Sequence, residues 1–482
     1  MKKFKLQFSF AFLPRSLYAT VKKVMLHVCF VIIALALIKN PVARADFDPE
    51  LAAQLQDSLD RKVQQYELVG ASAAVILPNQ GAWLGTSGYS VPANSDTIRS
   101  DMLFGIGSVT KTFTAAMMLR LADDGVLSLD DSLHQWIPSF AHVDSTITIR
   151  QLLQHTSGIF NFTDHSDFPQ ANFADPTRFW SPEDVLTKLL NPPYFAPGTD
   201  WKYSNTNYII AGMIIRKATG HEISNELHRR FLDPHNLNRT FLGVEDSLRG
   251  ELVHYWLNPN NDGHSMTRTS IYSLAWTAGA IFATAEDVAK WAILLYSGEF
   301  FSQTYMDEML TFHPSSNYGL GTQYLSYLGQ RMWYHTGGIY GFNSVMVYMP
   351  DHEASFVVLL NSGQPAAPIV NSALVRAYLN YRPSTRVADS DQVLPGGFAL
   401  QQNYPNPFNP TTRIKFAVPT SVQVKLVVYD LLGREVALLV DERLNAGQHS
   451  VTFDASHLAS GVYVYRLQAG EEVHTRKLIL VR

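Results

Sequence analysis

The chain has 482 residues, of which 46% are hydrophobic and 17% are charged, and its formal net charge is -4 at pH 7. This composition is that of a protein with a large buried core, and the acidic balance argues against nucleic acid as a partner. Cys29 is the only cysteine, which excludes a disulfide framework and a cysteine metal site within these residues.

Residues 1–45 have the composition of an export signal. They contain eight Lys or Arg residues and no Asp or Glu, and their apolar run, 24–38, is followed by the small-x-small sequence Ala43-Arg44-Ala45. This pattern predicts a signal peptide over 1–45, and a retained N-terminal anchor is the alternative. Either interpretation places the protein outside the cytoplasm. Removal of the segment leaves 30 basic against 42 acidic residues, a net charge of -12.

The segments after the signal peptide predict a sheet built from both ends of one large domain, residues 46–382. An amphipathic helix and a β-hairpin begin the domain, and a second hairpin and a helix end it. These elements are expected at 48–66, 71–77 and 82–89, and at 342–348, 355–360 and 366–380. Together they predict an α/β (α+β) domain with one antiparallel sheet and helices on its faces.

Between these ends the sequence predicts mostly helices and loops, and one stretch combines a hydroxyl with an amine. Two glycines, Gly105 and Gly107, allow a turn before a helix expected over 109–123. Ser108 then lies at the helix N-terminus, and Lys111 lies one turn on, on the same side. A lysine amine within hydrogen-bond reach can activate a serine hydroxyl, and the helix dipole favours a developing oxyanion. The alternative is a chance Ser-x-x-Lys in which Ser108 only caps the helix.

Two later stretches complete a three-part pattern. Tyr203-Ser204-Asn205 ends a loop before an apolar helix, and His335-Thr336-Gly337-Gly338 follows a strand-like run. Ser-x-x-Lys, then Tyr-x-Asn, then a basic residue followed by Thr-Gly resembles the serine β-lactamase and penicillin-binding protein superfamily. The variant with Tyr and His is similar to the class C branch, which includes D-alanyl-D-alanine carboxypeptidases and esterases. The resemblance extends over 47–381, with further matching stretches at 152–158 and 278–287.

The resemblance implies a β-lactamase-like fold, with helices on both faces of a central antiparallel sheet and a helical region beside it. It also implies a role for each motif residue. Ser108 would be the nucleophile, and Lys111 and Tyr203 would take and return its proton while keeping each other's pKa low; which of the two is the base stays open. The backbone N–H groups of Ser108 and Gly338 would form the oxyanion hole. The substrate would be bound by Asn205 at its amide and by His335, Thr336 and Gly337 at a carboxylate.

His335 departs from the pattern, because class C β-lactamases usually have Lys at that position. A His with an ordinary pKa carries only a partial charge at neutral pH, which argues against efficient β-lactam hydrolysis. The sequence therefore predicts a serine hydrolase that forms an acyl-enzyme with a small D-alanyl peptide or a related amide or ester. An esterase or a weak β-lactamase is the alternative on the same scaffold, and a non-catalytic penicillin-binding-like surface module is the alternative of another class. No metal or cofactor is expected.

The remaining histidine motifs are interpreted as structural. His155, within His-Thr-Ser-Gly, is expected to cap a helix end rather than to pair with a second serine. The His-Glu pairs 221–222 and 352–353 lack a second His four residues on, so zinc is not expected. The long irregular stretches 160–180 and 257–271 are expected to form the rim of the active-site cleft.

The sequence changes character at 383–397, a polar stretch with a Pro-Gly-Gly that predicts a linker. Residues 398–482 then consist of short strand-like runs separated by turns. This pattern predicts a β-sandwich of about seven strands. The stretches 403–412, 429–435, 459–463 and 475–477 resemble the C-terminal sorting domain of the type IX secretion system. That resemblance implies the secretion machinery as a partner and a secreted or outer-surface location in a bacterium, with association at the outer membrane. An accessory immunoglobulin-like module that binds carbohydrate or only packs is the alternative.

Overall fold

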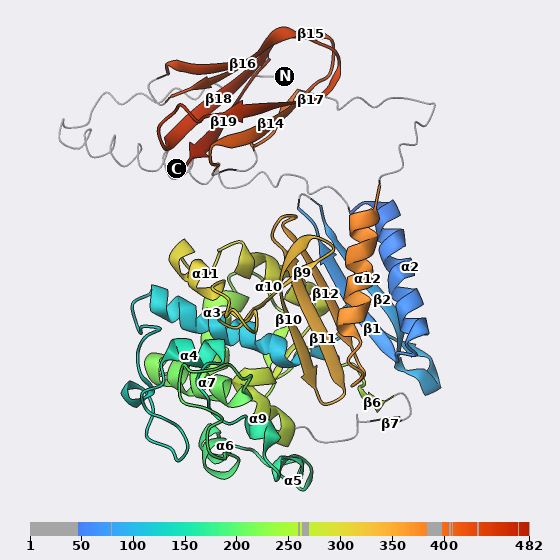
Figure 1. Cartoon of the computed structure of the whole chain (residues 1–482). Helices are drawn as coiled ribbons and strands as arrows, with labels where there is room; N and C mark the ends of the chain where they lie inside the picture. The colour runs from blue at the N-terminus through green and yellow to red at the C-terminus, as the bar shows by residue number, and fades with distance from the viewer. Residues whose placement is uncertain are drawn as a thin grey trace, which may run out of the picture. The chain divides into compact units, whose positions relative to one another are not determined.

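The computed structural model describes residues 47–78, 80–258, 261–262, 269–382, 398–403, 406, 408–430, 433–470 and 472–481 (Figure 1). The chain divides into two compact units, with the boundary between Pro383 and Ser384. The expected signal peptide, 1–45, and the expected linker, 383–397, lie outside the described residues. None of the helices in the described part of the chain combines the length and the apolar character that a membrane span needs.

The larger unit is built on a seven-stranded antiparallel sheet in the order β3-β2-β1-β12-β11-β10-β9 (Figure 1). Its strands are β1 (Gly70–Ile76), β2 (Ala82–Val91), β3 (Asp96–Thr97), β9 (Gln323–Tyr327), β10 (Gln330–Ile339), β11 (Phe342–Met349) and β12 (Ala354–Leu360). The two ends of the unit meet inside this sheet, where Ala71 pairs with Leu360 and Ile76 pairs with Ser355. The antiparallel sheet predicted from the sequence is confirmed.

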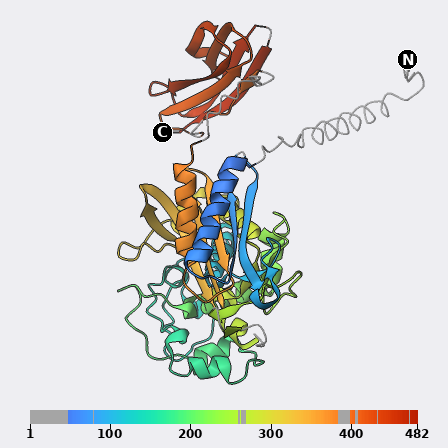
Figure 2. The same cartoon turned by 90° about the vertical axis from the view of Figure 1, so that its right-hand side faces the viewer.

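One face of the sheet is covered by α2 (Pro49–Gln65) and α12 (Ala367–Asn380), which lie side by side (Figure 2). Their apolar sides pack on every second residue of β1, namely Ala71, Ala73 and Val75. The chain enters the sheet from α2 and continues from it into α12. Both ends of the unit therefore lie on this face.

The opposite face of the sheet carries α10 (Ala285–Tyr296) and a helical region. α3 (Thr110–Asp123) is buried on almost all sides, so it forms the centre of this region. The other helices are α4 (Ile149–Gln154), α5 (Phe168–Phe173), α6 (Pro182–Lys188), α7 (Asn205–Thr219), α8 (Ile223–Leu227), α9 (Thr269–Gly279) and α11 (Gln303–Met309).

Short elements connect the helices. The 3-10 turns are η1 (Pro92–Asn94), η2 (Gly107–Val109), η3 (Leu133–Gln135) and η4 (Phe162–Asp164), and η5 (His228–Leu232) is a π-helix. The strands β4 (Phe104–Gly105), β8 (Ile281–Ala283) and β5 (Thr240–Leu242) form a small sheet, and β6 (Trp256–Asn258) pairs with β7 (Asn261–Asp262). β4 leads directly into the turn that carries Ser108.

The smaller unit is a β-sandwich with sheets in the orders β13-β14-β17 and β16-β15-β18-β19. Its strands are β13 (Ala399–Leu400), β14 (Thr411–Val418), β15 (Val422–Tyr429), β16 (Glu435–Leu444), β17 (Gly447–Asp454), β18 (Gly461–Ala469) and β19 (Glu472–Leu480). Apolar residues of both sheets, among them Phe416 and Leu467, form one core. The described residues of this unit thus contain the seven strands expected from the sequence.

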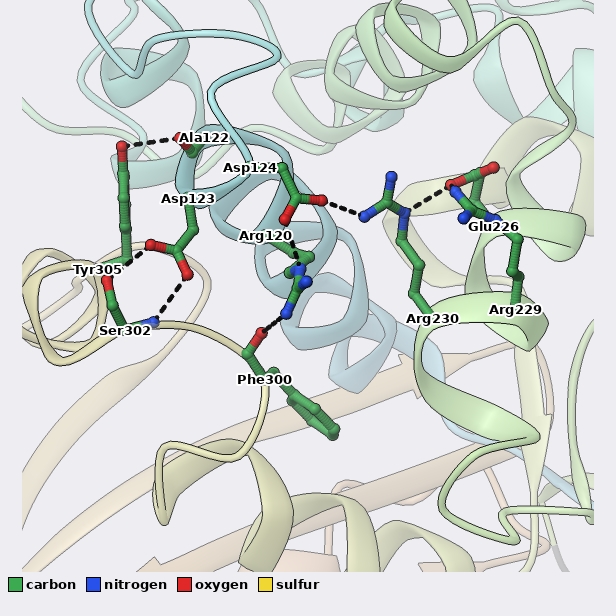
Figure 3. A network of polar contacts seen from close by, with 10 residues as sticks. All are labelled: Arg120, Ala122, Asp123, Asp124, Glu226, Arg229, Arg230, Phe300, Ser302 and Tyr305. Carbon is green, nitrogen blue, oxygen red and sulfur yellow. Dashed lines mark hydrogen bonds and ion pairs between the residues drawn. The ribbon is translucent and has the colours of Figure 1, made fainter. Parts of the chain in front are cut away.

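A network of charges ties the C-terminal end of α3 to two other segments (Figure 3). Glu226, in α8, is 1% exposed and lies 2.7 Å from both Arg229 and Arg230. Arg230 also pairs with Asp124, which in turn lies 3.0 Å from Arg120. The remaining contacts join Arg120 to the carbonyl of Phe300, Asp123 to Ser302, and Tyr305 to the carbonyl of Ala122. The network therefore fixes one end of the helix whose other end carries Lys111.

Replacing Glu226 with Gln should destabilise the larger unit by about 2 kcal/mol, because the buried carboxylate loses its charge-assisted hydrogen bonds with Arg230, which is 16% exposed, and with the exposed Arg229. Burial alone would raise the pKa of Glu226, but hydrogen bonds from Arg229 and Arg230 lower it below its ordinary value of 4.5. The stabilisation is therefore present above pH 4.5 and is lost as the pH falls through the folded pKa.

Urea unfolding of the full-length protein, followed by tryptophan fluorescence, tests this prediction, because all 8 Trp residues lie in the larger unit. Asp57→Asn is the matched control, since Asp57 pairs with Arg61 at the surface and should contribute less than about 1 kcal/mol. Equal effects of the two substitutions at pH 7 would contradict the assignment of a buried, stabilising network.

Candidate active site

Three segments that are far apart in the sequence meet at the N-terminal end of α3. Ser108 lies in η2, Tyr203 and Asn205 lie at the start of α7, and His335 to Gly338 end β10. The turn approaches β10 so closely that a Cβ atom on Gly107 would lie 2.6 Å from the backbone nitrogen of Gly338. Gly107 also has a φ of 51°, a conformation that favours glycine. This glycine therefore allows Ser108 to lie beside the end of β10.

Lys111 is completely buried and makes three hydrogen bonds. Its Nζ lies 3.0 Å from Ser108 Oγ, 2.8 Å from Asn205 Oδ1 and 2.7 Å from the carbonyl oxygen of Ala278. Burial lowers the pKa of Lys111 well below its ordinary value of 10.5. A neutral amine has two hydrogens and one lone pair. Asn205 and Ala278 offer only acceptor oxygens to it, so they take the two hydrogens and the lone pair faces Ser108 Oγ.

Tyr203 is the second group at Ser108. Its hydroxyl makes a hydrogen bond with Ser108, and its ring centre lies 5.0 Å from Lys111 Nζ. Burial raises the pKa of Tyr203 well above its ordinary value of 10.0, and the hydrogen bond with Ser108 offsets only part of the rise. The prediction of a low pKa is thus confirmed for Lys111 and wrong for Tyr203. The burial that lowers the pKa of Lys111 disfavours the ammonium form, which is the form that would stabilise a phenolate.

His155 supports the loop that carries Tyr203. Its backbone ends α4 with a φ of 64°, and its side chain is fully buried. The ring nitrogen Nδ1 lies 3.2 Å from the backbone nitrogen of Ser204 and 3.2 Å from Asn207 Nδ2, and the ring centres of His155 and Tyr203 are 4.3 Å apart. The interpretation of His155 as a structural residue at a helix end is confirmed.

His335 is 2% exposed and is neutral. Its Nδ1 lies 2.6 Å from the carbonyl oxygen of Thr336, which can only accept, so Nδ1 carries the proton. Nε2 then accepts from the hydroxyl of Tyr318, 2.9 Å away. Burial lowers the pKa of His335 to about 3. This placement differs from the expectation of a partly charged ring that faces a substrate carboxylate, because desolvation disfavours the charged ring.

A cavity of about 350 Å³ lies beside Ser108. The polar residues Ser108, Thr163, Asn172 and Asn205 line it together with Gly338, and its remaining walls are Phe162, Phe168, Ile271, Leu274, Ala275, Ala278, Gly279, Ile339 and Tyr340. Within the described part of the chain, no charged residue lines it. A larger groove, of about 710 Å³, lies between α2 and α12 and includes none of the predicted site residues.

The cavity combines motif residues with residues that the motifs did not indicate. Ser108, Asn205 and Gly338 line it together, whereas Lys111 is buried behind Ser108. The sequence motifs do not include Thr163 or Asn172. Both residues belong to the stretch 160–180, which was expected to form the rim of the active-site cleft. The length of that irregular stretch was the only sequence signal that pointed to them.

Helix α9, whose Ala278 accepts a hydrogen bond from Lys111, contains a strained residue, Trp276. Its backbone has a φ of 30° and a ψ of -121°, which interrupts α9. A bulky residue in this conformation costs roughly 1–3 kcal/mol and persists only where its surroundings hold it. The indole Nε1 donates to Glu245, 2.7 Å away, and Thr114 Oγ1 donates to the carbonyl of Thr277, 2.7 Å away. These contacts hold the segment that presents the carbonyl of Ala278 to Lys111.

Comparison with known proteins agrees with this arrangement. The Beta-lactamase family model matches residues 55–379. A penicillin-binding protein of Bacillus subtilis (strain 168) is 26% identical over 383 residues, which cover 74% of this chain and 79% of that protein. Esterase EstB of Burkholderia gladioli is 30% identical over 196 residues, which cover 38% of this chain and 50% of the esterase.

A solved structure and a second family model complete the comparison. The crystal structure of a D-stereospecific amidohydrolase from Streptomyces sp. is similar, with a TM-score of 0.59, 28% identity, and coverage of 68% of this chain and 98% of that chain. Residues 402–481 match the secretion system C-terminal sorting domain, which indicates type IX secretion and a secreted or cell-surface protein. With its central sheet, its buried lysine and a family match over two thirds of its length, the chain belongs to the beta-lactamase family of serine hydrolases.

Proposed function

We propose that Ser108 is the nucleophile of an acyl-enzyme reaction on D-alanyl peptides or related amides and esters. The observation that carries this proposal is the buried amine of Lys111, whose Nζ lies 3.0 Å from Ser108 Oγ. A general base works best when its pKa lies near the operating pH, and the burial of Lys111 lowers its pKa in that direction. A surface protein that only binds its ligand has no need of such a base.

Acylation begins when Lys111 takes the proton of Ser108 and Oγ attacks the carbonyl carbon of the substrate. The backbone N–H groups of Ser108 and Gly338 stabilise the oxyanion, and one such donor is worth about 3 kcal/mol. Tyr203, which its raised pKa keeps protonated, gives its proton to the leaving group and regains one from Lys111. Water then cleaves the acyl group from Ser108 by the reverse proton transfers. Lys111 is thus the base in this proposal, a choice that the sequence left open.

The remaining motif residues bind or position the substrate. Asn205 and Gly338 line the cavity, and Thr336 and Gly337 precede Gly338 along the edge of β10. His335 is a positioning residue in this scheme, because its neutral ring touches Tyr318. A neutral His335 offers a substrate carboxylate no positive charge, which favours amides and esters over a free C-terminal carboxylate. The similarity to an esterase and to a D-stereospecific amidohydrolase supports the same choice.

Substitution of Ser108 tests the nucleophile directly. The full-length protein should gain one adduct with a fluorophosphonate probe in intact-mass spectrometry, and Ser108→Ala should gain none, because the probe needs an activated hydroxyl. Ser157→Ala is a matched control, since Ser157 is a buried serine that hydrogen-bonds Asn207 and should not change the labelling. Labelling of Ser108→Ala at the wild-type rate would contradict the proposal.

Benzylpenicillin in the same assay separates the alternatives. A persistent adduct on Ser108 would indicate a penicillin-binding peptidase, and rapid hydrolysis of the drug would indicate a β-lactamase. An intact drug and an unmodified protein that still reacts with the fluorophosphonate would favour the amidase or esterase.

The pH dependence of the labelling rate should report Lys111. The rate should increase with pH through the folded pKa of Lys111, well below 10.5, because only the neutral amine can take the proton of Ser108. No decrease is expected near pH 10, since the pKa of Tyr203 is raised. Lys111→Gln should lower the rate by about a hundred- to ten-thousandfold, which is the usual contribution of a general base.

Lys290→Gln is the control for the pH experiment, because Lys290 pairs with Glu286 at the surface. Its labelling profile should match the wild type. A wild-type rate that falls as the pH increases from 6 to 9 would contradict the role of Lys111 as base.

We further propose that 1–45 is a signal peptide, that 46–382 is the catalytic domain, and that 383–397 links it to the sorting domain, 398–482. Deletion of 398–482 should abolish delivery to the cell surface and medium in a bacterium with a type IX system, while fluorophosphonate labelling of Ser108 in the retained protein persists. Cell fractionation and immunoblotting measure the distribution. Unchanged delivery would instead support the accessory carbohydrate-binding module.

A further inference from the structure

The carbonyl of Ala278 makes the shortest of the three hydrogen bonds to Lys111, with its oxygen 2.7 Å from Nζ. It follows a break in the helix, because Trp276, two residues earlier, has a φ of 30° and a ψ of -121°. Since φ and ψ are the two soft angles of each residue, a change at one residue redirects the whole segment that follows. The position of the Ala278 carbonyl therefore depends on the kink at Trp276.

The side chain of Trp276 holds the kink, which a bulky residue does not keep without support. The indole is 4% exposed. Its Nε1 donates to Glu245 Oε1, 2.7 Å away, and its ring centre lies 5.0 Å from the guanidinium carbon of Arg216, in α7. Gly212, one turn earlier in α7, leaves room for the ring, since a Cβ atom there would lie 2.7 Å from Trp276 Cζ3. The ring thus packs on α7 and is anchored by Glu245.

Glu245 is itself fixed at both of its carboxyl oxygens. Oε1 accepts from Trp276, and Oε2 accepts from the backbone nitrogen of Ser224, 2.8 Å away, in α8. Each oxygen faces an N–H group, which suits a carboxylate. Burial raises the pKa of Glu245, and these two hydrogen bonds oppose the rise. A hydrogen bond to a charged group contributes about as much as a strained backbone costs, so this contact can offset the strain at Trp276.

We propose that Glu245 is a positioning residue for Lys111, an inference that rests on the proposed role of Lys111 as the base. Glu245 anchors the indole of Trp276 and thereby fixes the kink that brings the Ala278 carbonyl to Nζ. The described residues that line the cavity do not include Glu245, so it acts through these groups. Without the carbonyl, one hydrogen of the neutral amine is released. The amine can then turn and donate to Ser108 Oγ instead of accepting its proton.

Fluorophosphonate labelling of full-length variants between pH 5 and pH 10 tests the inference. Trp276→Phe keeps a ring and loses the donor, and Glu245→Leu loses the acceptor. Each should lower the rate at the high-pH plateau, where Lys111 is neutral, by about tenfold or more, because a misplaced base loses much of its effect. The midpoint of the rate profile should also move to lower pH, by about 0.5 or more, because a lost carbonyl acceptor had favoured the ammonium form.

A double variant separates positioning from general damage. Trp276→Phe leaves an oxygen of Glu245 without its donor, whereas replacement of both partners by apolar groups removes that penalty. Trp276→Phe combined with Glu245→Leu should therefore unfold at a higher urea concentration than Trp276→Phe alone, while its plateau rate stays low. Glu222→Gln is the matched control, because Glu222 is a carboxylate that pairs with Arg216 at the surface. Its plateau rate and midpoint should match the wild type.

The outcomes distinguish this inference from the function on which it rests. An unchanged plateau rate in both single variants would overturn the inference. So would a lower plateau whose midpoint stays in place or moves to higher pH, or a double variant that labels at the wild-type rate. A wild-type protein whose Ser108 is not labelled, or a Lys111→Gln variant that labels as fast as the wild type, would overturn the proposed function instead.

Discussion

Lys111 Nζ is enclosed by protein, so its ammonium form would lose the hydration that makes a lysine positive in water. Its neighbours are the hydroxyl of Ser108, the amide oxygen of Asn205 and the carbonyl of Ala278, and none of them carries a negative charge. Burial acts on the neighbouring titratable groups as well. It lowers the pKa of Lys111 well below its ordinary value, keeps the phenol of Tyr203 protonated and keeps the ring of His335 neutral. An uncharged site of this kind moves protons without a permanent charge next to the substrate.

The fold holds this amine in place by close contacts between backbone segments. Gly107 lies against Gly338, and a Cβ atom on Gly337 would lie 2.0 Å from the carbonyl oxygen of Ile106. A Cβ atom on Gly212, in α7, would lie 2.4 Å from Thr277 Oγ1, next to the strained backbone of Trp276. Side chains at these positions would push apart the segments that meet at Ser108. The geometry of the site therefore depends on residues that take no part in the chemistry.

Much of this arrangement follows from local sequence, and the exceptions have physical reasons. The turn before α3 and the spacing of Ser108 and Lys111 predict their hydrogen bond, because three residues along a helix bring two side chains together. The short apolar runs of β1 and β12 predict strands of one sheet, although only the fold shows that these two strands pair with each other. The pKa of Tyr203 could not be predicted, because it depends on burial by segments distant in the sequence. Thr163 and Asn172 lie in the stretch 160–180, whose sequence predicts irregular structure although Asn172 belongs to the short helix α5, and no periodicity there indicates which residues line the cavity.

The positions of α2 and α12 bear on how such an enzyme can be attached to a surface. Both helices cover the face of the sheet opposite to the helical region, and the residues that line the catalytic cavity pack on that other side. The chain of the larger unit therefore begins and ends behind the site. A tether at either end of the larger unit is therefore joined on the face of the sheet away from the cavity. An engineered support joined after α12 would be attached on this same face.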